Sequence, residues 1–138
     1  MMRWLLIILG ALHVSWGVPA VVAPRWFYEN FPGAGRRWTA AYPPYNEHLM
    51  SDVGAAFLTL GVLLLMAAWM AERRVTMVAL TGLLVFSTLH LVYHARERGL
   101  MSGPDLGASL VTLALGVIIP LAMLIALRDR RGVWTERS

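Results

Sequence analysis

The sequence contains no cysteine and no lysine, and few of its residues carry a charge. Without cysteine, disulfide scaffolds, thiolate metal sites, thiol catalysis and iron–sulfur clusters are excluded. Charged residues make up 14% of the 138 residues, compared with about 25% in soluble domains. Hydrophobic residues make up 58%, compared with about 45–50% in soluble domains. Together with a mean hydropathy of +0.60, this composition argues against a soluble domain and against disorder. It is typical of an integral membrane protein.

The excess of positive charge does not indicate nucleic-acid binding. The net charge is +4, and all twelve basic residues are arginines. They flank the apolar segments instead of forming one patch, as basic residues do in the loops of membrane proteins. The expected partner of this chain is therefore a lipid bilayer and not a nucleic acid.

Four apolar segments are long enough to cross a bilayer, which takes a helix of about 20 residues. The predicted spans are 4–23, 49–71, 75–95 and 106–127. Because the second and third connections are short, consecutive helices are expected to be antiparallel neighbours. The prediction is an all-α fold, an antiparallel bundle of four transmembrane helices that forms a single domain over residues 1–138.

The first connection, residues 24–47, differs from the others in length and composition. It holds half of the aromatic residues of the chain, namely Trp26, Phe27, Tyr28, Phe31, Trp38, Tyr42 and Tyr45. Since Trp and Tyr favour the headgroup zone, the segment is expected to anchor the protein at the interface. A long loop in a compact fold also fits a lid over the outer end of the bundle.

The arginines predict the orientation in the membrane. One side of the predicted spans carries Arg3, Arg73, Arg74, Arg128, Arg130, Arg131 and Arg137. The other side carries Arg25, Arg36, Arg37, Arg96 and Arg98. The larger number predicts that both termini are cytoplasmic and that residues 24–47 lie outside. A composition without lysine and rich in alanine suggests a bacterium, so the expected location is the bacterial plasma membrane.

All four histidines and one carboxylate fall in the outer half of this bundle. His48 and Asp52 lie four residues apart near one end of the second span, and His90 and His94 have the same spacing in the third. Such spacing puts both donors of a pair on one helical face. Helix bundles bind metal ions with pairs of this kind on facing helices. The pattern predicts one metal site with these four residues as ligands.

Further polar residues are candidates for orienting the imidazoles or for binding a cofactor. They are His13, Glu47, Ser87 and Tyr93. In a site without thiolates, imidazole and carboxylate groups suit Zn, Cu or Fe. The alternative cofactor is haem b, held by two histidines at matching depth, such as His48 with His94 or His13 with His90.

Each span also carries one stripe of small or polar residues at helical spacing. Small and hydroxyl residues let membrane helices approach closely, so these stripes are expected to face other helices. They are Gly10, His13 and Gly17; His48, Asp52, Ala55 and Thr59; Leu83, Ser87, His90 and His94; and Asp105, Ser109, Thr112 and Gly116.

The same residues allow functions without a cofactor. Histidines among the headgroups and a carboxylate paired with an arginine at the rim would suit a non-catalytic accessory subunit of a larger membrane complex, or a homo-oligomer. Titratable groups inside spans also suit a proton-coupled carrier of a small solute. No nucleophile-elbow, nucleotide-binding or zincin motif is present, so whether the protein is an enzyme stays open.

Two stretches carry a resemblance to a known group of proteins. The first span ends through Gly17-Val18-Pro19, and the second runs from Asn46-Glu47-His48 into Asp52-Val53-Gly54-Ala55-Ala56. With its size and four spans, the chain resembles the small four-helix integral membrane proteins of bacteria that are DoxX-like in character. The resemblance implies a four-helix membrane fold and, as for some members, an association with quinone-linked redox partners. It implies no catalytic residue.

Overall fold

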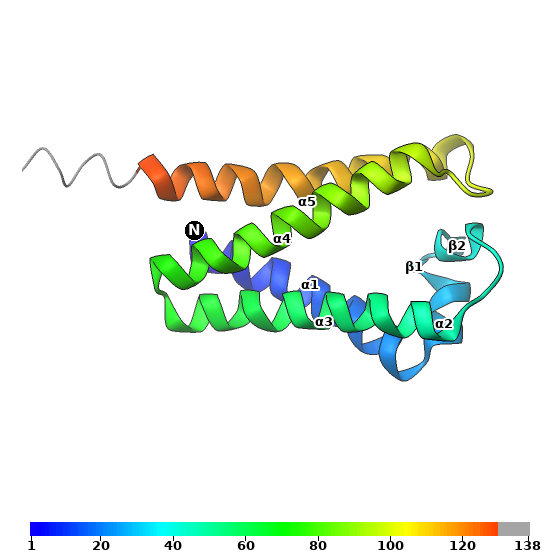
Figure 1. The fold of residues 1–138 in the computed structure, drawn as a ribbon, viewed down its shortest axis with the longest axis horizontal. Helices are drawn as coiled ribbons and strands as arrows, with labels where there is room; N and C mark the ends of the chain where they lie inside the picture. Colours follow the sequence, from blue (N-terminus) through cyan, green and yellow to red (C-terminus); the bar gives the residue numbers. More distant parts are fainter. Residues whose placement is uncertain (130–138) are drawn as a thin grey trace, which may run out of the picture.

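The computed structural model describes residues 1–129 of the chain. Its elements are α1 (Met2–Val22), α2 (Pro24–Asn30), β1 (Pro32–Gly33), β2 (Arg36–Arg37), the 3-10 turn η1 (Thr39–Ala41), α3 (Glu47–Met70), α4 (Arg73–Arg96) and α5 (Gly103–Asp129) (Figure 1). Four helices are long and apolar enough to cross a membrane, namely α1, α3, α4 and α5. The predicted all-α class is confirmed, and the protein is a multi-pass membrane protein.

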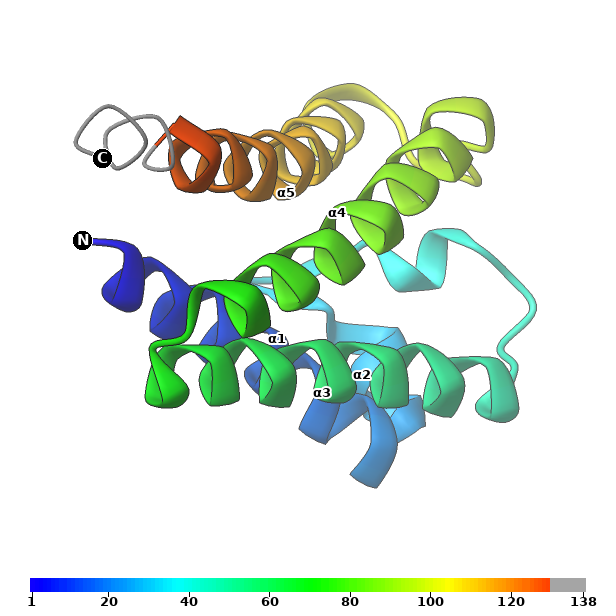
Figure 2. The same ribbon diagram turned by 60° about the vertical axis from the view of Figure 1, so that its left-hand side comes forward.

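The helices agree closely with the predicted spans and extend most of them by about a turn or less. The N-terminus and the C-terminal end of α5 lie at the same end of the molecule, as an even number of spans requires (Figures 1 and 2). Three arginines used in the orientation argument, Arg130, Arg131 and Arg137, lie outside the described residues.

The ends of α3 have clear local causes. The side chain of Asn46 accepts a hydrogen bond from the backbone N–H of Leu49 at 3.1 Å, which caps the first turn. At the other end Ala71 adopts a left-handed conformation with φ of 55°, which stops the helix. Because α4 begins at Arg73, the connection between α3 and α4 is a tight turn of Ala71 and Glu72, and it is short as predicted.

Helices α1 and α3 pack backbone to backbone through buried glycines. A Cβ on Gly17 would lie 2.6 Å from the backbone nitrogen of Leu58 and 2.9 Å from the carbonyl oxygen of Gly54. A Cβ on Gly61 would lie 2.9 Å from the carbonyl oxygen of Gly10. No side chain fits at these positions. The pair therefore depends on small residues, as close-packed membrane helices generally do.

The predicted inward stripe is confirmed in α1 and largely in α4. The buried or half-buried residues are Gly10, His13, Gly17, Leu83, Ser87, His90 and His94. In α5 the stripe is partly right, since Ser109 is buried while Thr112 is exposed. For α1 and α4, small and polar residues at helical spacing therefore identified the inward face.

The predicted inward stripe of α3 is wrong. His48, Asp52, Ala55 and Thr59 are all exposed, and the buried face carries Gly54, Phe57, Gly61 and Leu64 instead. The physical reason is the packing against α1. Close approach of two backbones needs glycine on the contact face, and this requirement outweighs the polarity of the histidine and aspartate.

At the turn between α3 and α4, all four long helices contribute to one apolar core. Its buried members are Leu6, Leu64, Ala67, Ala68, Ala79, Leu80, Leu83, Met123 and Leu127. From this turn α4 diverges from α3 along its length and runs toward the start of α5 (Figures 1 and 2). The two ends of the molecule are consequently built differently.

Residues 24–46, here named the cap segment, bridge the diverging helices. Trp38 Nε1 donates to Asp105 Oδ1 at 3.3 Å, and an Arg36 guanidinium nitrogen lies 3.4 Å from the same oxygen. The backbone N–H of Leu100 donates to the Ala41 carbonyl at 2.8 Å. The predicted loop is therefore an ordered element with a short helix, a hairpin and a 3-10 turn.

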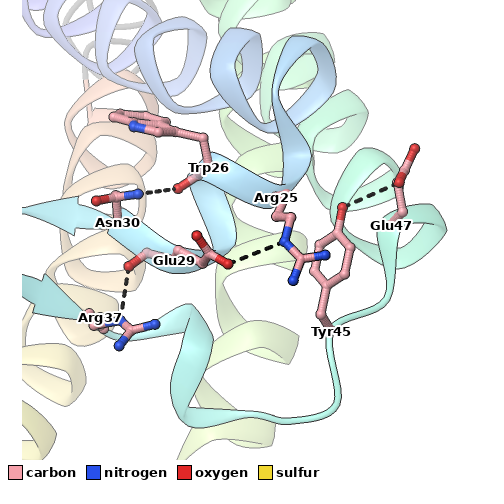
Figure 3. A network of polar contacts seen from close by, with 7 residues as sticks. All are labelled: Arg25, Trp26, Glu29, Asn30, Arg37, Tyr45 and Glu47. Carbon is pink, nitrogen blue, oxygen red and sulfur yellow. Dashed lines mark hydrogen bonds and ion pairs between the residues drawn. The ribbon is translucent and has the colours of Figure 1, made fainter.

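A polar network ties α2 to the rest of the cap segment and to the start of α3 (Figure 3). Arg25 Nε donates to Glu29 at 3.3 Å, and its guanidinium lies 5.3 Å from the centre of the Tyr45 ring. The Tyr45 hydroxyl donates to Glu47 at 3.5 Å, and Arg37 Nε donates to the Glu29 carbonyl at 3.1 Å. Glu47, the first residue of α3, therefore contacts the cap segment through Tyr45.

Candidate functional site

The structure keeps the two predicted ligand pairs apart. His48 Nε2 lies 3.3 Å from Asp52 Oδ2, and these side chains are 87% and 63% exposed. The rings of His90 and His94 are stacked, with centroids 4.7 Å apart, and both are half-buried. Among residues 1–129, no three His, Cys, Asp or Glu side chains form a group that could hold a metal ion. Binding of one ion by all four residues stays a prediction.

The rotation of α3 explains why the pairs are apart. Gly54 and Gly61 face α1, and the face with His48 and Asp52 is exposed. Phe57 lies on the same helical face as these two glycines, so its ring points into the structure and is buried. Its ring centroid lies 5.9 Å from that of His13 and 6.3 Å from that of His90.

Five rings from three helices make a continuous array, here named the ring array: His13, Phe57, Phe86, His90 and His94. Phe86 contacts Phe57 at 5.6 Å and His90 at 5.4 Å between centroids. Three of the four histidines therefore belong to one set of contacting rings. His48 takes no part in the ring contacts found for the described residues.

The hydrogen bonds of Tyr42 favour one tautomer of His94. The Tyr42 hydroxyl donates to the Glu97 carbonyl at 2.9 Å and lies 2.7 Å from His94 Nδ1. A phenol has a single proton and a carbonyl can only accept, so both contacts are hydrogen bonds together only when the Tyr42 oxygen accepts from Nδ1–H of His94. In the neutral imidazole, the lone pair is then on Nε2.

His13 has the same tautomer for a similar reason. Its Nδ1 lies 2.8 Å from the Leu9 carbonyl oxygen, which can only accept, so Nδ1 carries the proton and Nε2 the lone pair. The side chain is buried, with only 8% of the residue exposed. Beyond the array, the His13 ring also contacts Trp16, with 5.5 Å between the ring centroids.

Burial raises the pKa of the Tyr42 phenol above its usual value, and the neighbouring Tyr93 and Glu97 raise it further. The hydroxyl is therefore neutral at ordinary pH and keeps the single proton on which the tautomer of His94 depends. Tyr42, which belongs to the cap segment, thus holds the imidazole of His94 by a hydrogen bond.

The other predicted supporting residues occupy different surroundings. Tyr93 is 55% exposed, and the centroid of its ring lies 5.3 Å from that of His94. Ser87 is buried against α5, where a Cβ on Gly116 would lie 3.6 Å from its hydroxyl oxygen. Glu47 is exposed at the rim. His13 is therefore a member of the ring array and Tyr93 contacts it at His94, while Ser87 and Glu47 contact other groups.

Sequence reasoning missed Phe57 and Tyr42. The signal for Phe57 was present, because it lies three residues after Gly54 and four before Gly61 on one helical face. Tyr42 had no such signal. It reaches His94 from an irregular segment, where spacing does not reveal which residue meets which helix.

No protein-family model, curated protein or solved structure matches this chain. The resemblance to the DoxX-like membrane proteins stays a prediction. The positions of the chain's own residues are therefore the basis for a function.

Proposed function

We propose that this is a small plasma-membrane protein that binds a transition-metal ion or a redox cofactor through imidazole Nε2 atoms of the ring array. One observation carries the proposal. Nδ1 of His13 and of His94 each lies within hydrogen-bond distance of an oxygen, and donation of Nδ1–H to that oxygen leaves the Nε2 lone pair for a ligand. Metal-binding histidines are usually held in this way, because the second hydrogen bond fixes the tautomer and the ring orientation.

His90 and His94 are the first candidate ligands. They are one turn apart on a single face of α4, and their rings are already side by side. His13 is the candidate third ligand, from α1. The Phe57 ring contacts both His13 and His90, so we expect it to move when one ion binds both. Imidazole ligands without thiolate suit Zn, Cu or Fe, and two histidines suffice for the alternative, haem b.

The proposal changes the ligand set predicted from the sequence. His48 and Asp52 contact each other and are mainly exposed, so we expect them to contribute nothing to this site. This difference supplies a matched control, since His48 is a histidine of the same chain outside the ring array.

The test is elemental analysis and a visible spectrum of the purified full-length protein after reconstitution with Zn²⁺, Cu²⁺, Fe²⁺ or haemin. Wild type and His48→Ala should hold metal or show a Soret band at one equivalent. The double variant His90→Ala/His94→Ala should lose it. Absence of any bound group in wild type, or equal loss in His48→Ala, would contradict the proposal.

Tyr42→Phe gives a finer test of the same site. It keeps the ring and removes the oxygen that accepts from His94. Loss of such a hydrogen bond typically weakens metal binding by about 10–100-fold. An unchanged affinity in a metal competition titration would show that the Tyr42 contact plays no part in binding.

The orientation belongs to the same proposal. We infer a bacterial inner membrane with both termini in the cytoplasm, supported by the larger number of arginines at the ends of the chain and around the turn between α3 and α4. The ring array then lies toward the outer face.

A second candidate function is that of an accessory subunit in a larger membrane complex. It is favoured by the low coverage of α5, of which 17% is buried compared with 39% for α3. Its exposed apolar side chains include Val111, Leu115 and Ile118. Copurification of a stoichiometric partner in mild detergent, together with a failed reconstitution, would favour this function.

A further inference from the structure

A groove lies between α4 and α5 at the end of the molecule opposite to the cap segment. It has a volume of about 400 Å³ and is lined by Arg73, Met77, Leu124, Ile125 and Arg128. In Figure 1 this is the end at which α4 begins and α5 ends. The groove lies far along α4 from His90 and His94, so what it binds does not depend on the proposed function.

Arg73 is held in place at the mouth of this groove. Its Nε and Nη2 atoms donate to the Leu127 carbonyl at 3.1 and 2.8 Å. That carbonyl lies in the last described turn of α5. Since a guanidinium carries further N–H donors, Arg73 keeps donors for an anion while its position is fixed.

The second cation at the mouth is Arg128, whose side chain is exposed. It comes from the last turn of α5, while Arg73 is in the first turn of α4. The described residues that line the groove include no acidic side chain. The partial positive charge of the α4 N-terminus adds to the same field. The mouth therefore attracts an anion.

The floor of the groove is apolar. Met77, Leu124 and Ile125 lie about one helical turn from the arginines, in the direction of the middle of the span. A phosphate at the mouth and a hydrocarbon chain along the floor would match both parts of the groove. This is the shape and polarity of a phospholipid at the edge of the bilayer.

We propose that the groove binds an anionic phospholipid. The phosphate contacts Arg73 and Arg128, and one acyl chain lies on Met77, Leu124 and Ile125. An anionic lipid is favoured over a zwitterionic one because no acidic side chain lines the described groove to pair with a headgroup amine. Clusters of basic residues at the ends of membrane helices bind anionic lipids for the same electrostatic reason.

The experiment is native mass spectrometry of the full-length protein from nanodiscs that contain equal amounts of phosphatidylglycerol and phosphatidylcholine. Wild type should retain phosphatidylglycerol preferentially. Arg128→Gln should weaken this retention about fivefold, the factor expected for one basic residue beside an anionic headgroup. The matched control is Arg98→Gln, an exposed arginine at the opposite end, which should leave retention unchanged.

A second variant separates a lipid from a free anion. Met77→Trp fills the floor and keeps both arginines, so it should lower lipid retention at least as much as Arg128→Gln. Inorganic phosphate alone should neither bind stably to wild type nor displace the lipid at millimolar concentration. Equal retention of both lipids, equal effects of Arg98→Gln and Arg128→Gln, or retention unaffected by Met77→Trp would each overturn the proposal. Far-UV circular dichroism shows whether each variant keeps its helices.

Discussion

The two ends of this helix bundle are held together by different means. At the turn between α3 and α4, apolar side chains of all four long helices meet, and Leu64 and Leu80 are wholly buried. At the other end α4 diverges, and the cap segment connects the helices through single polar contacts of Trp38, Tyr42 and Ala41. The first end is held by apolar packing of all four long helices, whereas at the second end polar contacts join the cap segment to α4 and α5.

This difference indicates where the molecule can change shape. Buried packing contacts are numerous and cooperative, whereas one hydrogen bond contributes only about 1 kcal/mol to stability. The end with the ring array can therefore rearrange at low cost while the opposite end stays intact. A site that must admit an ion or a cofactor is better placed at the weaker end.

The largest expected effect comes from breaking the backbone contact of α1 with α3. Gly17→Leu puts a side chain where a Cβ alone would lie 2.6 Å from a backbone nitrogen. We expect a loss of about 3 kcal/mol in the free energy of unfolding, at the upper end for overpacked sites. Unfolding with sodium dodecyl sulfate in dodecyl maltoside micelles measures it.

The control for this variant is Gly82→Leu. A Cβ on Gly82 meets no heavy atom within 4 Å, and removing a glycine from a helix interior is itself favourable. Equal destabilisation at both positions would mean that the α1–α3 contact is not the cause.

The packed end is tested next by Leu80→Ala. Leu80 is wholly buried in the core shared by the four long helices, so its truncation should cost about 2 kcal/mol. The same micelle titration applies. Leu89→Ala, at a position 66% exposed on the same helix, should have almost no effect, and a similar loss there would contradict the role given to the core.

The hydrogen-bonded end should respond less. Tyr42→Phe removes the contacts with His94 and the Glu97 carbonyl, and we expect a loss of about 1 kcal/mol. The matched variant is Tyr45→Phe, which loses only a 3.5 Å contact with Glu47 at the rim. If Tyr42→Phe costs as much as Leu80→Ala, the two ends do not differ in the way described.

The smallest effect is a pH dependence that comes from Tyr42. Burial raises the pKa of this phenol in the folded protein, so the folded state keeps a proton that the unfolded state releases. The contribution is fully present below about pH 10, the usual tyrosine value, and is lost as pH rises through the folded pKa. Unfolding titrations above pH 10 should show a steeper decline for wild type than for Tyr42→Phe. Parallel curves would contradict this.

Much of the architecture was predictable from local patterns. Apolar length gave the four helices, and helical spacing gave the inward faces of α1 and α4 with His13, Ser87, His90 and His94. These properties depend on residues within one helix. The face of α3 was misjudged because polarity was used as the criterion, although Gly54 and Gly61 carried the relevant signal.

The sequence by itself determined the membrane character and placed the four long helices to within about a turn, because hydrophobic length is a local property. Only the tertiary structure decided which side chains meet. Contact between the backbones of α1 and α3 sets the rotation of α3, which exposes His48 and Asp52 and brings Phe57 against His13 and His90. The cap segment then brings Tyr42 to His94, a meeting of two distant segments that no local periodicity encodes.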